Sequence, residues 1–323
     1  MHSSEPRNGS RRFLLWFLLG HLMLGGFYVI LDRTGYLPPP PFAKSISFDA
    51  KAVWLRDHAR LREPINLLAL GSSMTLNNFN SQTVFDALPG QHYVNGSSWG
   101  LKLRHIDQFF RFLNERYRIS TLVVCSSIVD FRTDEDEIPV QVPHAGLLAY
   151  DLDGGSKALC ELLLFSGRYF VGNMKKMRFL TERNDDYQSL RFDRGGGVPF
   201  ASRGFAIDSS RWEGKFLEHV VIDERNYTAL HDLARYCRAR GIGMVLCTTP
   251  ARRQALSYLP AGVLAGHMAR LRTMASADNF LLLEADNNHF DDAMFVDWGH
   301  LNEVGAKRYT ATMLDSMARA GVF

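Results

Sequence analysis

The chain has 323 residues, of which 46% are hydrophobic and 22% are charged, and its formal net charge is +3. This composition excludes a disordered or low-complexity chain and leaves enough apolar side chains for at least one sizeable core. The near-neutral charge, with no basic stripe interleaved with aromatic residues, argues against a nucleic-acid partner. The four cysteines form no C-x-x-C pair, which argues against a zinc site and against a disulfide-dense scaffold.

The first predicted element is an apolar helix over residues 13–31, which read FLLWFLLGHLMLGGFYVIL and include no Asp, Glu, Lys or Arg. At 1.5 Å per residue this helix is about 29 Å long, enough to cross the hydrocarbon core of a bilayer. Three arginines precede it, so the positive-inside rule predicts a cytoplasmic tail over residues 1–12 and an extracytoplasmic remainder. A cleaved signal peptide is the alternative, but residues 32–36 (DRTGY) offer no small-residue cleavage site. We therefore expect an uncleaved transmembrane anchor.

The rest of the chain divides into a linker and one folded domain. Residues 32–60 form a proline-rich linker and lead-in, in which Pro38–Pro41 predict a short, stiff, extended spacer. Residues 61–323 form the folded domain. Within this domain, residues 134–218 break the alternation of strands and helices, so we expect an insertion over one end of the sheet that serves as a lid or a docking surface.

Short apolar runs that alternate with helical patterns predict five strands in the folded domain. In chain order these strands cover Ile65–Leu70, His92–Asn95, Thr121–Cys125, Gly243–Thr249 and Phe280–Glu284. Helices are expected over Leu103–Arg116, Tyr227–Gly241 and Glu303–Arg319. Continuous apolar strands separated by helices predict an α/β fold, with a parallel sheet covered by helices on both faces. In such sheets, functional sites form at the carboxyl ends of the strands.

Two short motifs lie at that edge of the predicted sheet. Gly71-Ser72-Ser73 follows the first strand, and a serine on a tight strand-to-helix turn has an exposed hydroxyl beside backbone N–H groups that can hold an oxyanion. Asp297-Trp298-Gly299-His300 precedes the last helix, and a carboxylate three residues before a histidine can orient its imidazole. Together they predict a serine nucleophile served by a histidine and an aspartate.

The order and spacing of these motifs resemble the SGNH (GDSL-like) hydrolases, whose sheet is flavodoxin-like. Leu70-Gly71-Ser72-Ser73 is similar to the first family block, with Ser72 in place of the usual aspartate. Asn95 and Gly100 match the second block, and the stretch from Asp297 to Ala306 matches the last block closely. The resemblance implies that Ser73, His300 and Asp297 are catalytic, and that the N–H groups of Ser73 and Gly100 form the oxyanion hole.

The third family block departs from the pattern. Where the family has Gly-x-Asn-Asp, this chain has Ser126-Ser127-Ile128-Val129-Asp130, so the asparagine of the oxyanion hole is missing. Loss of one oxyanion donor costs about 10²–10³ in rate, so another group must replace it or the activity is weak. Ser126, Ser127 and an amide of the insertion are all candidates at this point. The substrate-binding candidates are Ser72, Asn95, Trp99, Ser127, Thr249 and Trp298, and neither a metal nor a cofactor is expected.

A narrower resemblance is to membrane-anchored branches of this superfamily, the DltD-type proteins of teichoic-acid D-alanylation and the alginate O-acetylation proteins. It implies an acyltransferase, O-acetyl by default, in the inner membrane of a bacterium with its catalytic domain in the periplasm. The implied partners are an acyl donor, a polysaccharide or other glycan acceptor, the membrane itself and a multi-spanning membrane O-acyltransferase. Two other readings stay open: an esterase or deacetylase that uses water, and a catalytically weak scaffold or glycan-binding partner.

Overall fold

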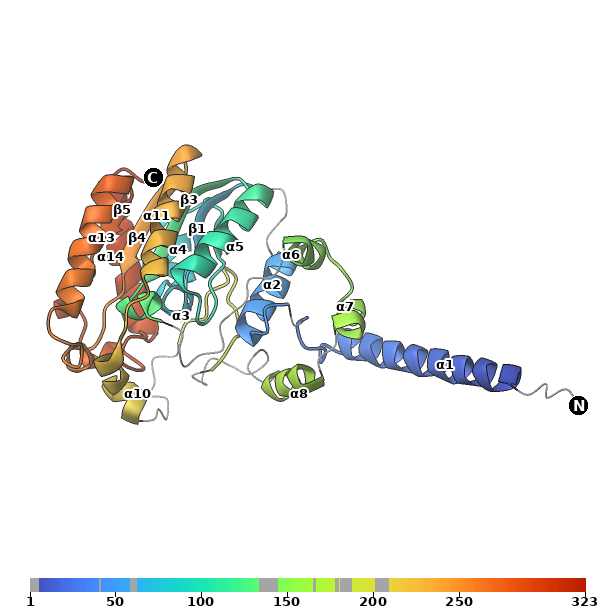
Figure 1. Cartoon of the computed structure of the whole chain (residues 1–323). Helices are drawn as coiled ribbons and strands as arrows, with labels where there is room; N and C mark the ends of the chain where they lie inside the picture. The colour runs from blue at the N-terminus through green and yellow to red at the C-terminus, as the bar shows by residue number, and fades with distance from the viewer. Residues whose placement is uncertain are drawn as a thin grey trace, which may run out of the picture.

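A five-stranded parallel sheet forms the centre of the molecule, in the order β2-β1-β3-β4-β5 (Figure 1). The computed structural model describes residues 6–40, 42–58, 63–133, 145–164, 167–177, 180, 188–200 and 209–323. The strands are β1 (Ile65–Ala69), β2 (Tyr93–Asn95), β3 (Ile119–Ser126), β4 (Gly243–Thr248) and β5 (Leu281–Leu283). The predicted α/β class, the five strands and their parallel direction are therefore confirmed, with shifts of one to two residues at the strand ends.

Both faces of the sheet are buried, and this explains why its strands are continuously apolar. Because successive side chains point to opposite faces, Leu68, Leu122 and Leu246 belong to the larger core cluster. Their neighbours Val123 and Val245 belong to a second cluster on the other face. A one-sided sheet would instead alternate apolar and polar residues.

Helices cover the two faces of the sheet. The first face packs against α5 (Leu103–Arg116), α11 (Glu224–Ala239) and α13 (Val263–Asp278). The second face packs against α4 (Ser81–Ala87) and α14 (Glu303–Arg319), with α3 (Ser73–Asn78) directly after β1. The bounds predicted for α5 and α14 agree with the structure, whereas α3, α4 and α13 were not predicted. Short helical turns complete the domain: η1 (Ile128–Phe131), α10 (Ser209–Glu213), η2 (Lys215–His219), α12 (Arg253–Leu256), η3 (Asn287–His289) and η4 (Asp292–Met294).

The apolar N-terminal segment forms one long helix, α1 (Pro6–Arg33), which extends away from the folded domain (Figure 1). Its part from Gly9 to Arg33 has a mean hydropathy of 2.0 and is long and apolar enough to cross a membrane. The segment after it, where a short, stiff spacer was predicted, is packed into the fold as far as Pro40, and Pro41 lies outside the described residues. Leu37, Pro38, Pro39 and Pro40 are buried, and Leu37 packs with Tyr28 of α1 and with Ala158. The chain then forms the helix α2 (Ile46–His58), which no pattern had predicted.

The described part of the insertion includes the helices α6 (Ala145–Leu152), α7 (Lys157–Leu164) and α8 (Gly167–Lys176). They lie beside α2 and the end of α1 (Figure 1). The chain then returns to the edge of the sheet, where the carbonyl of Gly195 accepts a 2.7 Å hydrogen bond from the N–H of Asn95. Phe200 forms a bridge with Asn302, close to the last predicted motif. The described part of the insertion thus packs on the anchor side and on the sheet edge, and the acidic run 134–137 lies outside the described residues.

Candidate active site

Ser73, His300 and Asp297 form one chain of hydrogen bonds at the carboxyl edge of the sheet. His300 Nε2 lies 2.8 Å from Ser73 Oγ, and His300 Nδ1 lies 2.8 Å from Asp297 Oδ2. Because the carboxylate accepts the Nδ1 proton, Nε2 is left to accept the hydroxyl proton of Ser73. Asp297 is 1% exposed, whereas Ser73 is only half-buried. The carboxylate that orients His300 therefore lies inside the protein, whereas Ser73 lies nearer the surface.

Hydrogen bonds from the backbone to Asp297 hold this geometry. Asp297 Oδ1 accepts hydrogen bonds from the N–H groups of Gly299 and His300, at 2.9 and 2.7 Å. The carboxylate therefore closes its own turn with one oxygen and orients the imidazole with the other. The ring of Phe200 contacts the ring of His300 edge-on, with centroids 6.0 Å apart. Phe200 comes from the insertion, and no sequence motif had drawn attention to it.

Ser73 begins the helix α3 immediately after β1. Ser72 is the N-cap of α3, and its hydroxyl accepts a 3.1 Å hydrogen bond from the N–H of Met74. A Cβ on Gly71 would lie 2.0 Å from Thr75 Oγ1, so only glycine lets α3 come this close to β1. The hydroxyl of Thr75 in turn donates to the carbonyl of Cys125 and accepts from its N–H, at 2.8 and 3.1 Å. These contacts fix the serine turn to the central strand β3.

The two residues that the resemblance predicts for an oxyanion hole, Ser73 and Gly100, lie on neighbouring turns. Gly100 has φ +68°, in the left-handed region that favours glycine. The loop before it is held against the serine turn by a 3.1 Å hydrogen bond from the N–H of Ser98 to the carbonyl of Gly71. Within the described part of the chain, the N–H groups of Ser73 and Gly100 donate no hydrogen bond. Both donors are therefore free for a ligand.

Two of the six predicted substrate-binding residues have structural roles instead. Asn95 is fully buried: its amide donates to the carbonyl of Thr75 and accepts from the N–H of Ser97, so it shapes the loop that leads to Gly100. Ser72 is 3% exposed and caps α3. Because neither side chain has a surface for a ligand, we correct the expectation that they contact substrate. Trp99 is half-buried and packs against a small cluster that includes Leu76 and Val198.

The other three predicted residues, Ser127, Thr249 and Trp298, line one cavity of about 200 Å³. This cavity lies where β3, β4 and β5 end, and its wall is completed by η2 and α13 through Leu217, Leu264 and Met268. Trp298 is 6% exposed and packs edge-on against Phe216, with ring centroids 5.3 Å apart. The cavity is therefore largely apolar, with hydroxyl groups where the strands end.

The divergent third block carries a buried carboxylate. Asp130 Oδ2 accepts from Ser126 Oγ at 3.1 Å and from the N–H of Ser127 at 2.9 Å. Burial raises the pKa of Asp130, and the nearby ammonium of Lys102 acts in the opposite direction. The carboxylate of Asp130 thus holds the turn that follows β3, through Ser126 and Ser127.

These contacts separate the two serines that were candidates to replace the missing asparagine. Ser126 Oγ already donates a hydrogen bond to Asp130. Ser127 Oγ makes no hydrogen bond with the described residues, and neither does Thr249 Oγ1. Ser127 is therefore the hydroxyl of this block that remains for a ligand.

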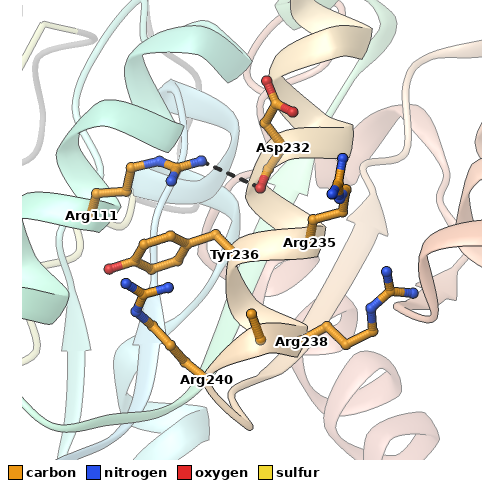
Figure 2. Close-up of a pocket in the computed structure, with 7 residues that line it drawn as sticks. Arg111, Asp232, Arg235, Tyr236, Arg238 and Arg240 are labelled. Carbon is orange, nitrogen blue, oxygen red and sulfur yellow. Dashed lines mark hydrogen bonds between the residues drawn. The ribbon is translucent and has the colours of Figure 1, made fainter.

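A second hollow lies on another part of the surface, between α5 and α11 (Figure 2). It measures about 430 Å³, and arginines dominate its lining. The guanidinium groups of Arg111 and Arg240 stack on the ring of Tyr236, 4.4 and 3.7 Å from its centroid. Because the end of α11 leads into the start of β4, this hollow lies at the amino ends of the strands. It contains none of the predicted site residues.

Comparison with known proteins finds a likeness among solved structures. No protein-family model matches the sequence, and no curated protein matches it. A solved structure from Bacteroides fragilis NCTC 9343, titled a "putative acylhydrolase", matches with a TM-score of 0.43 and 11% sequence identity. The match covers 84% of this chain and 96% of that chain.

Proposed function

We propose that this chain is a membrane-anchored, serine-dependent acyltransferase that works on carboxylic esters through Ser73, His300 and Asp297. The observation that carries the proposal is the hydrogen-bond chain from Ser73 Oγ through His300 to the buried Asp297. This is the arrangement that nucleophilic acyl transfer requires: a nucleophile in contact with a base, and a base oriented by a third group. The resemblance of the motifs to SGNH hydrolases supports the same assignment.

The proposed reaction has two half-reactions. His300 Nε2 takes the proton of Ser73 Oγ while that oxygen attacks the ester carbonyl, and the same proton then goes to the leaving alcohol. The bond from the carbonyl carbon to the leaving oxygen breaks, and an acyl-serine remains. In the second half-reaction the acceptor hydroxyl gives its proton to His300 and attacks the acyl carbon. The bond from that carbon to Ser73 Oγ breaks, and His300 returns the proton to Ser73 Oγ. Asp297 stays ionised throughout and stabilises the imidazolium.

Charge that develops on the carbonyl oxygen needs donors that are already in place. The N–H groups of Ser73 and Gly100 serve this role in the proposal, since neither donates a hydrogen bond to another described residue. Ser127 supplies a third contact to the bound substrate in place of the missing asparagine, because its hydroxyl has no partner among the described residues and Ser127 lines the cavity where β3 and β4 end. Ser126 is excluded from this role by its hydrogen bond to Asp130.

The proposed acceptor is a hydroxyl of a cell-envelope or secreted polysaccharide, and the proposed acyl group is acetyl. A cavity of about 200 Å³ is smaller than the 300–1,000 Å³ of drug-sized ligand sites, which suits a short acyl group or one sugar ring. The anchor helix supports a substrate at the cell envelope. A bacterial inner-membrane location with a periplasmic catalytic domain, and a multi-spanning membrane protein as source of the acyl group, belong to the same proposal.

The first experiment tests whether Ser73 reacts as a nucleophile. Full-length protein in detergent is exposed to a fluorophosphonate, and separately to an activated acetyl ester, before its intact mass is measured. We expect one adduct on the wild type and none on Ser73→Ala. Ser126→Ala is the matched control, since Ser126 lies in the same region and should leave the adduct unchanged. A folded wild type that forms no adduct would reject the serine mechanism and favour the scaffold role.

The second experiment separates transfer from hydrolysis. The acetylated protein is divided between buffer alone and buffer that contains acetylatable oligosaccharides. Faster loss of the acetyl group with oligosaccharide, together with an O-acetylated sugar product, supports the acyltransferase. Loss at the same rate in both, with only acetate released, assigns the chain as an esterase.

A further inference from the structure

The last turns of the anchor helix are packed against the insertion. Tyr28 of α1 is 1% exposed, and its ring contacts Phe170 of α8 edge-on, with centroids 5.6 Å apart. Ala158 and Leu162 of α7 join the same cluster, together with Leu31 of α1. The ammonium of Lys157 lies 3.8 Å from the carboxylate of Asp32, just past the apolar span. The anchor is thus held by two helices of the insertion where it meets the folded domain.

The position of this contact along α1 places it at the level of a membrane surface. Asp32 is the first charged residue after the apolar span, so the hydrocarbon boundary lies beside it if α1 crosses a bilayer. Tyr28 precedes Asp32 by four residues, or about 6 Å of helix. Amphipathic helices that lie in a membrane interface bury their apolar face about 5–10 Å into the headgroup and acyl boundary. Helices that contact Tyr28 therefore lie at interfacial depth.

The insertion also exposes apolar side chains next to this contact. Leu159 of α7 and Val171 of α8 are 44% and 53% exposed. Outside α1, the large apolar side chains exposed in the described residues are Tyr36, Leu147, Tyr150, Leu159, Val171, Val221, Val304 and Phe323. Half of these belong to α6, α7 and α8.

The end of α8 carries positive charge. Lys175 and Lys176 are both exposed and occupy its last turn. Basic residues at a membrane surface are attracted to anionic headgroups. Apolar side chains beside exposed lysines match the chemistry of a phospholipid interface.

We propose that α7 and α8 form a membrane collar, an interfacial support that lies in the headgroup region of the bilayer that α1 crosses. This proposal rests on α1 as the transmembrane anchor. The buried residues 37–40 agree with it, because this part of the connection between anchor and domain is packed into the fold. The collar holds the catalytic domain at one height and one orientation over the membrane surface, where a freely jointed linker would let it tumble.

The test uses spin labels on the full-length protein in nanodiscs of phosphatidylethanolamine and phosphatidylglycerol. Leu159→Cys and Val171→Cys report on the collar, and Val304→Cys is the control, since Val304 is a similarly exposed apolar residue on α14. Leu22→Cys reports on the anchor, where Leu22 is 73% exposed. All four variants carry Cys160→Ser, and the other three cysteines are buried in the fold. Collision with oxygen, which dissolves in lipid, is compared with collision with a water-soluble nickel chelate.

We expect labels at positions 22, 159 and 171 to collide more with oxygen than with nickel, and the label at position 304 to show the reverse. If position 22 is in lipid but positions 159 and 171 behave like position 304, the collar is rejected and the anchor stands. If position 22 is itself water-exposed, both proposals fail. If positions 159 and 171 are shielded from both reagents, they are packed against protein, and the lipid collar is rejected in favour of a protein partner.

Discussion

Asn78 holds the backbone on both sides of His300. Its side-chain amide donates a 3.1 Å hydrogen bond to the carbonyl of Gly299 and accepts a 2.8 Å hydrogen bond from the N–H of Leu301. Asn78 is fully buried and ends the helix α3, which begins at Ser73. One short helix therefore carries the proposed nucleophile at its start and fixes the position of the proposed base at its end.

We predict that Asn78→Ala lowers kcat by about 10–100-fold, because small misplacements of a catalytic group have effects of this size. It also leaves two buried backbone groups unpaired, so thermal unfolding should show a loss of about 2–4 kcal/mol. Asn77→Ala is the control: Asn77 is equally buried, but its amide donates to the carbonyl of Val198 instead. It should reduce stability and leave kcat of the folded protein unchanged. An unchanged kcat in Asn78→Ala would show that the loop holds His300 without this amide.

Asp297→Asn tests the orientation of the imidazole. An asparagine can still accept from the N–H groups of Gly299 and His300 through its oxygen, so the turn should keep its shape. It cannot accept the Nδ1 proton, so the imidazole takes the wrong tautomer, and kcat for ester hydrolysis should fall by about 10⁴-fold. Asp286→Asn, at an exposed aspartate that caps η3, should leave kcat unchanged. A drop of less than tenfold in Asp297→Asn would contradict the proposed role.

The neighbouring threonines at the end of β4 should respond differently to loss of the hydroxyl. Thr248 Oγ1 accepts a 2.9 Å hydrogen bond from the N–H of Ala285, whereas Thr249 Oγ1 has no partner among the described residues. Thr248→Val should therefore destabilise the protein by about 1–3 kcal/mol, and Thr249→Val should leave stability unchanged or improve it. Urea unfolding of both variants measures this difference. If Thr249 contacts substrate, Thr249→Val also raises KM, and an unchanged KM removes it from the substrate site.

We predict that His267 makes the folded protein less stable in mild acid. Burial lowers its pKa from 6.5 to about 4, and the nearby guanidinium of Arg270 adds to this effect. Its Nδ1 lies 2.6 Å from the hydroxyl of Tyr227, and the ring of Phe131 packs edge-on against it. Between pH 6.5 and 4 the unfolded chain binds a proton that the folded protein does not, so stability falls as the pH drops through this range.

The size of this effect can be measured by urea unfolding at pH 7 and pH 5. From the two pKa values, His267 should contribute about 2 kcal/mol of the stability lost between these pH values. His267→Gln should remove that part of the pH dependence, whereas His289→Gln, at an exposed histidine, should keep it. Equal pH dependence in the wild type and His267→Gln would mean that His267 titrates alike in the folded and unfolded chain.

The local pattern of apolar runs and short motifs was enough to predict the strands and the three residues that meet at the proposed active site. Continuous apolar runs identified the strands because both faces of the sheet are buried. Ser73 and the Asp297–His300 pair could be located because each stands directly beside a regular element, at the edge where parallel strands end. The helix α2 was missed because its buried face includes Asp49 and Lys51, and that mixture hides the apolar period.

The roles of the polar residues around that site depended on tertiary contacts. A sequence shows that Asn95, Ser127 and Thr249 are polar, but not which of their side chains form hydrogen bonds within the fold. Asn95 does, since its amide holds the Gly100 loop. The importance of Asn78 was equally hidden, because the residues it joins are more than 220 positions away.

The sequence alone therefore determined the α/β class, the order of the strands along the chain and the side chains available for acyl transfer, because these follow from local periodicity and residue chemistry. Tertiary structure decided which polar groups are already satisfied and which remain free for a ligand. It also decided that the insertion packs against the anchor. The physical reason is that hydrogen bonding and burial depend on neighbours in space, which the order of residues does not reveal.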